Sequence, residues 1–547
     1  MRTHSRRALL GAGIAAAGSG LLSAGSTPAA ATDHKTRRPY PDGSRDSHGP
    51  HGSPGSPGSR HSGHDTPTGY VDPAGPEVVE AERRRGTGPV RRFSLTADQT
   101  TFDLGGYTVD TWAYNDQLPG PEIRVNAGDR IAMTLHNRLP QSTTVHWHGL
   151  HLRNDMDGVP DITQRACKSD HSFDYTFTAS TPGTHWVHPH VGVQVDRGLY
   201  APLIVEDPHE PLSYDKEWVV MIDDWLDGLD GITPDEVLDE LNKDKPGGAM
   251  GHGEMQMGGR GGRPARRSSA AAALLTRHSR HRKDDFAANV DHPFHLMNGR
   301  APDDRETFHA KPGDRIRIRL INASGDTAYR VALGDHIMTV THSDGFPVEH
   351  QQTDSLVMGM AERYDVLVTA KDGVFPLTAL SAGKSNNKTA QALLRTGDGE
   401  APDPKHRPKE LRSGGIGADK LKAAEEVRLS DHSPDRTITM ELTGTDEKWD
   451  WAINGKPYTP SQRYAVREGE RVRIAFRNNT KMWHPMHLHG HTFALPNGGP
   501  RKDTTIVLPD KEVCVDFDAD NPGLWMVHCH NIYHSESGMM TIVGYRS

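Results

Sequence analysis

A unit that occurs three times along the chain constrains its fold more than any other feature of the sequence. Each copy begins at a glycine, continues as Asp or Glu, Arg and alternating apolar residues, and ends at an asparagine nine positions later. The three copies are Gly128–Asn137, Gly313–Asn322 and Gly469–Asn478. Another asparagine stands before a proline-containing turn upstream of each copy, at Asn115, Asn298 and Asn454. Period-2 alternation punctuated by Pro, Gly and Asn predicts an all-β sandwich or barrel.

The repeat divides the chain from residue 89 onward into three units of similar length. Each is about the size of one β-sandwich domain, so we predict domains at 89–208, 215–405 and 430–547. Residues 247–285 interrupt the second domain with a segment rich in Gly, Met, Arg and Ala. A long insertion of low complexity is usually either disordered or functional.

Two N-terminal segments are expected to lie outside these domains. Residues 1–31 combine a basic start, an apolar run over 8–22 and a small-residue end, which is typical of an export signal. Ser5-Arg6-Arg7 resembles a twin-arginine signal, with an ordinary secretory signal as the alternative. We therefore predict an exported protein, periplasmic, at the cell surface or extracellular, with no membrane span after processing. Residues 32–88, rich in Pro, Gly, Ser and His, predict a disordered tether.

The composition excludes several function classes. Sixty-three Lys and Arg against 72 Asp and Glu give a formal net charge of −9, which disfavours binding to nucleic acid or anionic lipid. Three cysteines cannot form a disulfide framework, and Cys167 and Cys514 are expected to be buried free thiols. Thirty-three histidines are too many for acid–base catalysis alone and favour metal binding.

Four His-X-His pairs occupy matching positions in the first and third copies. The first pair of each copy begins nine residues after the asparagine that ends the repeat, and a second pair follows about forty residues later. The histidines are His146, His148, His188, His190, His487, His489, His528 and His530. Residues i and i+2 of a strand point to the same face, so each pair directs two imidazoles to one point. Because the middle copy has Val331 and Leu333 instead, we expect the outer copies to face each other, with the middle copy as a spacer. Eight imidazoles suit three metal ions.

A second metal site is predicted around Cys529, which lies between His528 and His530 and points to the opposite face of the strand. His484, His534 and Met539 are close to it in sequence. Two histidines, a thiolate and a weak axial thioether are the ligands of a blue copper electron-transfer site. Because Cys529 is covalently joined to two cluster histidines, an electron can pass to the cluster through a few bonds. Four coppers can hold the four electrons that convert dioxygen to water.

These motifs resemble the four copper motifs of the multicopper oxidases, and the resemblance covers about residues 90–547. The motifs are His146-Trp147-His148-Gly149, His188-Pro189-His190, His484–His491, and His528-Cys529-His530 with His534 and Met539. The resemblance implies three consecutive cupredoxin-like Greek-key β-sandwich domains and four coppers per chain. It implies a type 1 copper on His484, Cys529, His534 and Met539, and a type 2 copper on His146 and His487. It also implies a type 3 pair, with one ion on His148, His188 and His530, and the other on His190, His489 and His528.

Reduction of dioxygen also consumes protons, which a carboxylate near the cluster would relay. Asp157, nine residues after His148, matches an aspartate of the family beside the cluster, although an Asp-Gly turn before Pro160 is the alternative interpretation. Many relatives carry a glutamate directly after the last type 1 histidine. Here Ser535 occupies that position and Glu536 follows it, so Glu536 is the second candidate.

The electron donor is less constrained by the sequence. A donor needs an exposed edge of His484 or His534, and laccase-type relatives oxidise phenols and aromatic amines. Cu(I) is the other candidate, because thioethers are soft ligands. Methionines expected near that edge are Met358, Met360, Met482 and Met486, and the insertion adds Met250, His252, Met255 and Met257. This segment resembles the methionine-rich insertions of copper-resistance members and favours Cu(I). The alternative is that Met486 packs in the core and that the insertion is a flexible loop.

Two other function classes are compatible with copper ligands. A copper nitrite reductase resembles two cupredoxin units and lacks the second His-X-His pair, so His188 and His190 count against it. A non-enzymatic exported protein that binds or sequesters copper would suit the His-rich and Met-rich segments. Such a protein would have no use for the His-Cys-His link.

Overall fold

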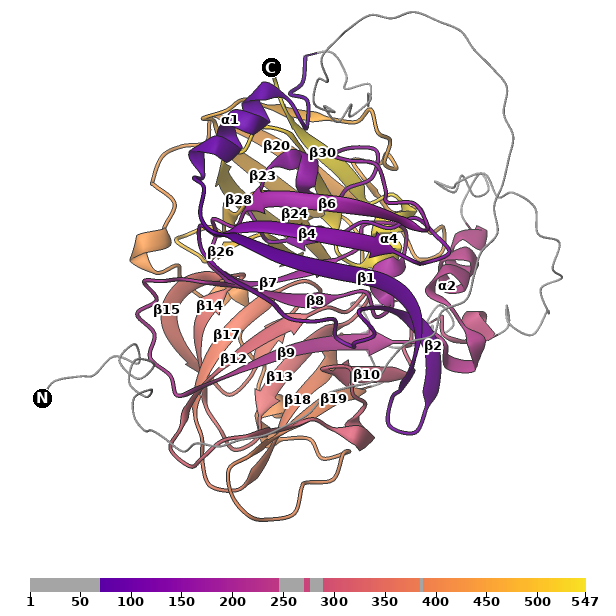
Figure 1. The fold of residues 1–547 in the computed structure, drawn as a ribbon, viewed down its shortest axis with the longest axis vertical. Helices are drawn as coiled ribbons and strands as arrows, with labels where there is room; N and C mark the ends of the chain where they lie inside the picture. The colour runs from indigo at the N-terminus through magenta and orange to yellow at the C-terminus, as the bar shows by residue number, and fades with distance from the viewer. Residues whose placement is uncertain (1–68, 245–269, 276–288, 384–386) are drawn as a thin grey trace, which may run out of the picture. The chain divides into compact units, whose positions relative to one another are not determined.

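The computed structural model describes residues 69–244, 270–275, 289–383 and 387–547. Within these residues six β-sheets form three sandwiches of two sheets each, as Figure 1 shows, which confirms the all-β prediction. The predicted export signal, most of the tether, and Met250, His252, Met255 and Met257 lie outside the described residues. Among the described helices, none has the length and apolar character needed to span a membrane.

The first sandwich pairs the sheet β2-β1-β4-β6 with the sheet β3-β8-β7-β5. Its strands are β1 (Val90–Asp103), β2 (Thr108–Tyr114), β3 (Ile123–Asn126), β4 (Arg130–Asn137), β5 (His146–His148), β6 (His171–Thr178), β7 (Gly183–His188) and β8 (Ala201–Glu206). Strand β4 is the first copy of the repeat and runs parallel to β1. Its side chains alternate between buried and half-buried, as the period-2 pattern predicts.

The middle sandwich pairs the sheet β10-β9-β12-β17-β14-β15 with the sheet β11-β19-β18-β13-β16. Its strands are β9 (Lys216–Trp225), β10 (Phe294–Met297), β11 (Thr307–His309), β12 (Arg315–Asn322), β13 (Ala328–Leu333), β14 (Met338–Ser343), β15 (Phe346–Thr353), β16 (Leu356–Met358), β17 (Arg363–Thr369), β18 (Val374–Ala382) and β19 (Thr389–Arg395), with helix α2 (Pro234–Leu241) after β9. Strand β12, the second copy, is buried on both faces and runs parallel to β9.

The third sandwich pairs the sheet β21-β20-β23-β28-β25-β26 with the sheet β22-β30-β29-β24-β27. Its strands are β20 (Arg436–Thr443), β21 (Ala452–Ile453), β22 (Tyr464–Val466), β23 (Arg471–Asn478), β24 (His484–Leu488), β25 (Phe493–Ala494), β26 (Arg501–Lys502), β27 (Thr504–Val507), β28 (Glu512–Asp518), β29 (Leu524–Cys529) and β30 (Met540–Tyr545), with helix α4 (Ile532–Ser537) before β30. Strand β23 is the third copy and runs parallel to β20. Cys167 and Cys514 are free; Cys167 is buried as expected, whereas Cys514 is partly exposed.

The repeated asparagines hold equivalent turns in the three sandwiches. At the end of each copy the side-chain amide donates to two backbone carbonyls, and its oxygen accepts the N–H two residues later: Asn137, Asn322 and Asn478. The upstream asparagines adopt φ values of 54°, 49° and 55° and bond the backbone of β1, β9 and β20: Asn115, Asn298 and Asn454. Asparagine suits these sites because it tolerates the left-handed region and bonds nearby backbone.

The predicted tether is wrong over its last part, because helix α1 (Pro76–Arg84) lies within it. Val78 and Ala81 are buried, and Val78 belongs to the hydrophobic cluster of the first and third sandwiches. Glu82 accepts the N–H of Thr178 in the first sandwich at 2.7 Å, and Arg85 donates to Asn521 of the third at 2.7 Å. These apolar and polar contacts order the segment despite its hydrophilic surroundings.

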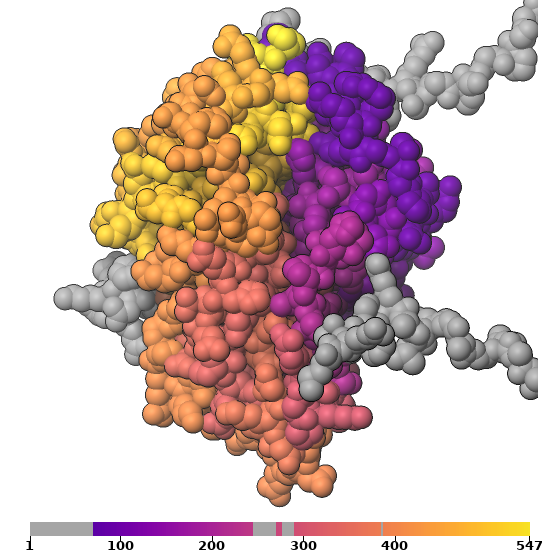
Figure 2. All heavy atoms as spheres, turned by 90° about the vertical axis from the view of Figure 1, so that its left-hand side faces the viewer, coloured from indigo at the N-terminus to yellow at the C-terminus, as the bar shows by residue number. Residues whose placement is uncertain are grey.

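The first and third sandwiches share one apolar core. Buried residues of both, such as Trp147 and Trp525, belong to a single hydrophobic cluster, whereas the middle sandwich has a core of its own around Val340 and Val366. In Figure 2 the indigo, orange and yellow parts of the chain meet on one face. The first and third sandwiches therefore lie against each other, as expected if each contributes half of one site.

Candidate metal centres

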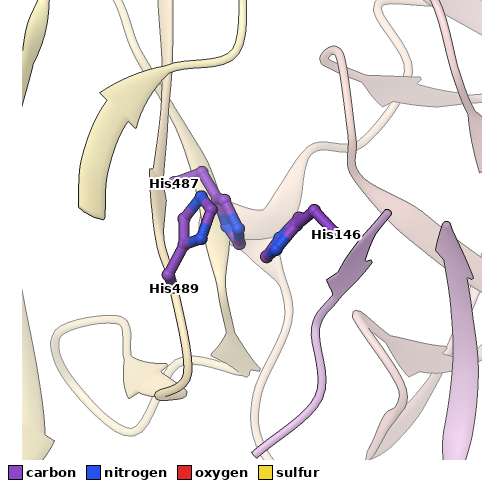
Figure 3. Close-up of side chains that lie close together, drawn as sticks. All are labelled: His146, His487 and His489. Carbon is purple, nitrogen blue, oxygen red and sulfur yellow. The ribbon is translucent and has the colours of Figure 1, made fainter. Parts of the chain in front are cut away.

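The eight paired histidines of the first and third sandwiches converge at one buried place. Strand β5 pairs with β7 so that His146 lies opposite His188, and β24 pairs with β29 so that His487 lies opposite His528. Across the boundary, the ring centroid of His146 is 3.9 Å from that of His489. Figure 3 shows His146 facing His487 and His489 from the other sandwich. The strand periodicity and the pairing of the outer units thus assemble the predicted cluster.

The ring nitrogens of this cluster are close enough to share metal ions. Among the described residues, sets whose ligand atoms lie within 4.8 Å of one another include these: His146, His487 and His489; His146, His148 and His188; and His190, His489 and His528. Within the cluster, four histidines have a buried Nε2 atom without a hydrogen-bond partner among the described residues: His146, His190, His487 and His530. Because a buried polar atom without a partner is costly, these four point to ligands that the protein itself does not supply. The donor set therefore fits bound metal ions.

The opposite ring nitrogens are fixed by oxygen acceptors. Nδ1 of four histidines lies 2.8–2.9 Å from a backbone carbonyl, which can only accept, so each Nδ1 carries the proton: His146, His188, His487 and His528. Nε2 is then the free ligand atom, an arrangement usual for metal-binding histidines. Burial is the largest cause that lowers the pKa of seven cluster histidines and keeps them neutral: His148, His188, His190, His487, His489, His528 and His530.

Two buried aspartates link the two halves of the cluster in a crossed manner. Asp157 of the first sandwich accepts from Nδ1 of His489 at 2.8 Å, and its carbonyl accepts from His146 at 2.8 Å. Asp503 of the third accepts from Nε2 of His148 at 3.0 Å, and its carbonyl accepts from His487. Each aspartate therefore orients one histidine of its own sandwich and one of the opposite sandwich.

Asp503 was missed by the sequence analysis, although it is equivalent in role to Asp157. Asp157 lies nine residues after His148, whereas Asp503 lies fourteen after His489, so no common spacing marks the pair. Arg363 and His148 are the main influences that hold the pKa of Asp503 well below its usual range against the effect of burial. A negative charge is therefore fixed beside His148.

The predicted second site also assembles, around Cys529. Its Sγ lies 3.6 Å from Nδ1 of His484 and 3.8 Å from Nδ1 of His534. The two Nδ1 atoms are 3.2 Å apart, so all three atoms surround one point. Met539 is buried and its carbonyl accepts the N–H of Cys529 at 3.1 Å. Burial raises the pKa of the Cys529 thiol and lowers that of His484 to about 3, which favours neutral groups until a cation binds.

The two histidines of this site have no exposed edge, contrary to the expectation. Both are 0% exposed, because Nε2 of His484 bonds the Thr480 hydroxyl at 2.7 Å and Nε2 of His534 bonds the Asn289 amide oxygen at 2.6 Å. The Trp451 ring covers them, with its centroid 4.3 Å from that of His534. Neither imidazole is therefore open to direct contact by a small molecule in this structure.

The four candidate methionines near this site do not form a common site. Met358 lies in the core of the middle sandwich, and Met360 contacts a separate small cluster beside Trp483. Met482 and Met486 belong to the core of the outer sandwiches. All four methionines are at most 3% exposed. Met486 therefore packs in the core in this structure, which was the alternative interpretation of the sequence.

The two candidate proton donors differ in position. Asp157 is fully buried between His146 and His489, and its Oδ1 lies 3.2 Å from Nδ1 of His146. Glu536 is half-buried on α4, where burial raises its pKa to about 7. Within the described residues no hydrogen bond joins Glu536 to a cluster histidine, whereas the Ser535 hydroxyl lies 3.3 Å from Nδ1 of His528. The helix thus turns Ser535, not Glu536, toward the cluster.

Comparison with known proteins identifies the architecture. Family models described as multicopper oxidase match residues 96–210, 271–399 and 431–546. The chain is 44% identical to multicopper oxidase MmcO of Mycobacterium tuberculosis, over 86% of this chain and 90% of that protein. It is 28% identical to a copper resistance protein A homolog of Pseudomonas syringae pv. tomato, over 82% and 91% of the two chains.

Solved structures show the same fold. The crystal structure of Fet3p, described as a multicopper oxidase that functions in iron import, aligns with a TM-score of 0.68 at 22% identity, over 83% of this chain and 90% of that chain. A laccase from Botrytis aclada aligns with a TM-score of 0.67 at 23% identity, over 84% and 88%. The expectation of three cupredoxin-like domains is confirmed. The chain therefore belongs to the multicopper oxidase family, and it is a copper-dependent oxidoreductase that uses dioxygen and carries type 1, type 2 and type 3 copper sites.

Proposed function

We propose that the protein oxidises its donor by one electron at a time at the Cys529 site and reduces dioxygen to water at the eight-histidine cluster. The convergence of the eight imidazoles, four of them with an unpartnered buried Nε2, is the observation that carries this proposal. Copper supplies one-electron redox chemistry at the first site and four-electron reduction of dioxygen at the second.

The chain's own residues divide the work between the two sites. His484, Cys529, His534 and Met539 would hold the type 1 ion. Thr480 and Asn289 orient the two imidazoles. Cys529 joins the sites through the backbone, because the residues on either side, His528 and His530, belong to the cluster. We assign the type 2 ion to His146 and His487, and the type 3 pair to His148, His188 and His530 and to His190, His489 and His528.

Proton delivery is assigned to Asp157, because its carboxylate contacts histidines of both halves of the cluster. We assign a proton-relay role to the Ser535 hydroxyl as well, because it lies 3.3 Å from Nδ1 of His528. Glu536 stands one residue further along α4, at a pKa of about 7, where a carboxyl can both accept and release protons near neutral pH.

We propose Cu(I) as the physiological donor and an exported protein active in copper resistance. The relatives named copper resistance protein A support this proposal, as do the basic N-terminal segment and the soft methionines of the insertion. Phenols and aromatic amines are the second candidate class, supported by relatives named laccase. Family membership and the second His-X-His pair count against the nitrite reductase and copper-storage alternatives.

Copper content and colour test the assignment of the two sites. The wild type is expected to hold four coppers per chain and to be blue. Cys529→Ser removes the soft thiolate, so we expect loss of the blue absorption and of one copper, with three coppers retained. A blue Cys529→Ser variant would contradict the type 1 site.

A comparison of donors tests the Cu(I) proposal. Oxygen consumption is measured with Cu(I) and with a phenol for the wild type and for a variant in which Met250, Met255 and Met257 of the insertion are changed to Leu, a volume-conserving change; Met482→Leu with Met486→Leu, in the core, is the control. We expect the Cu(I) rate to fall several-fold more than the phenol rate. Equal loss of both rates, or no loss, would count against Cu(I) as the favoured donor.

A further inference from the structure

A buried ion pair joins the middle sandwich to the cluster. Arg363, the first residue of β17, donates through Nη1 to Oδ1 of Asp503 and through Nη2 to Oδ2, both at 2.7 Å. Both residues are 0% exposed. A two-pronged bond between guanidinium and carboxylate fixes the plane of the carboxylate as well as its charge. Asp503 is the aspartate that accepts from His148.

Arg363 contacts all three sandwiches. Its Nε donates to the carbonyl of Thr184 on β7 of the first sandwich at 3.0 Å. Its backbone N–H donates to Asp344 of its own sandwich at 2.9 Å, and the same carboxylate accepts the N–H of Asp503 and of Thr504 at 3.2 Å each. The guanidinium and Asp344 thus fix both the side chain and the backbone of Asp503.

The glycine that follows His148 provides independent support for a close fit at this place. Gly149 has a φ of +89°, and a Cβ there would lie 2.3 Å from Nη2 of Arg363 and 2.9 Å from Oδ2 of Asp503. The His-X-His-Gly segment therefore packs directly on the ion pair, and only a residue without a side chain fits. The pair is part of the wall that supports the cluster.

We infer that Arg363 is a positioning residue of the copper cluster, acting through Asp503 on His148 and His487. The inference rests on the proposed function only in that these histidines bind copper. Arg363 holds Oδ1 of Asp503 where Nε2 of His148 can donate to it, which leaves Nδ1 of His148 as the ligand atom facing Nε2 of His188 at 3.4 Å. The described part of the middle sandwich, which supplies none of the histidines assigned to the cluster, thereby sets the geometry of the cluster and is more than a spacer.

Two matched arginine variants of the complete, copper-loaded protein test the inference. Arg363→Gln removes the two-pronged bond and leaves the buried Asp503 carboxylate without its cation. Arg317→Gln is the control, because Arg317 is also a buried arginine of the middle sandwich, with two bonds to Asp365, and its hydrogen bonds do not reach the cluster. Copper per chain after dialysis against a chelator, the type 2 resonance signal and the blue absorption are measured for each.

We expect Arg363→Gln to hold its cluster copper 10- to 100-fold less tightly, the usual effect of disturbing the hydrogen-bond partner of a metal ligand, which here is Asp503. Its type 2 signal is expected to change while the blue absorption remains, and Arg317→Gln is expected to match the wild type in both. Arg363→Lys serves where the glutamine variant fails to fold. It keeps the charge without the planar fork, so we expect an intermediate loss of copper.

The inference is overturned if Arg363→Gln or Arg363→Lys keeps cluster copper as tightly as the wild type with an unchanged type 2 signal. Equal copper loss in the Arg363 and Arg317 variants would also overturn it, because the effect would then be general loosening. A wild type that never binds cluster copper would instead contradict the proposed function, which separates the two failures.

Discussion

Replacement of Asp157 separates its two assigned tasks, orienting the cluster and supplying protons. In the wild type, Nδ1 of His489 lies 2.8 Å from the Asp157 carboxylate. The amide oxygen of Asp157→Asn can still accept from Nδ1 of His489, but the amide cannot deliver a proton as a carboxyl can. Asp157→Ala removes that acceptor as well. In both variants the backbone carbonyl of residue 157 still accepts from His146, so the orientation of that ring is unaffected.

The magnitudes follow from these contacts. A buried imidazole N–H left without an acceptor costs about 1–3 kcal/mol. At 1.4 kcal/mol per tenfold change in affinity, this is about 5- to 150-fold weaker copper binding for Asp157→Ala. Loss of a proton donor lowers the rate by about 10²–10⁴-fold, and this loss applies to both variants. Asp157→Asn should therefore be slow but fully loaded, and Asp157→Ala slow and copper-deficient.

Copper titration in the presence of a chelator measures the first effect, and oxygen consumption per bound copper measures the second. Normalising the rate to bound copper keeps the two effects separate. A fully loaded Asp157→Asn variant with the wild-type rate would refute the proton role. Unchanged copper retention in Asp157→Ala would refute the orienting role.

Two further predictions concern stability. Burial raises the pKa of Glu536 from 4.5 to about 7, so the stability that its proton contributes is present below about pH 4.5 and is lost as the pH rises through 7. Glu536→Gln cannot ionise, so its urea midpoints should decline less than those of the wild type between pH 5 and 8. Parallel midpoint curves for the two proteins would contradict this prediction. Deletion of residues 1–86 removes the buried Val78 and should lower the free energy of unfolding by about 2 kcal/mol or more relative to deletion of residues 1–68. Equal unfolding curves for the two deletions would show that α1 does not stabilise the fold.

Features that repeat along the chain were predictable because each copy of the repeat forms the same turn through local contacts. Asn137, Asn322 and Asn478 hold the same turn by bonds within a few strands of one sandwich. The paired histidines follow from strand periodicity, which places His146 and His148 on one face whatever the rest of the fold does. Strand geometry and the internal repeat together predicted the paired histidines in both the first and the third domain.

Helix α1 was missed although its sequence carries helix signals. Pro76 stands in its first turn, Glu77 follows there, and Arg83 and Arg84 occupy its last turn, each favourable at that end of a helix. The composition of residues 32–88 as a whole is hydrophilic, and averaging over that length concealed a nine-residue helix with two buried side chains. A short amphipathic helix is evident only from its own residues, apart from the hydrophilic residues around it.

Methionines and charged pairs were the least predictable because their partners are set by tertiary packing. Nearness in sequence to His484 placed Met482 and Met486 at a surface rim, yet both fill the apolar core. Thioether side chains serve equally well as ligands and as core residues, so sequence distance alone cannot distinguish the two roles.

The pair between Arg363 and Asp503 illustrates the same limit and its consequence for the fold. Its members are 140 positions apart, in different sandwiches, and follow no periodicity. The middle copy of the repeat carries Val331 and Leu333 where its sister copies carry histidines, which indicates a passive domain when the sequence is considered alone. Yet a buried guanidinium with a buried carboxylate requires both partners, since either alone would be an uncompensated charge in the interior. A domain whose described residues supply none of the cluster histidines is thereby joined to the cluster by a buried ion pair.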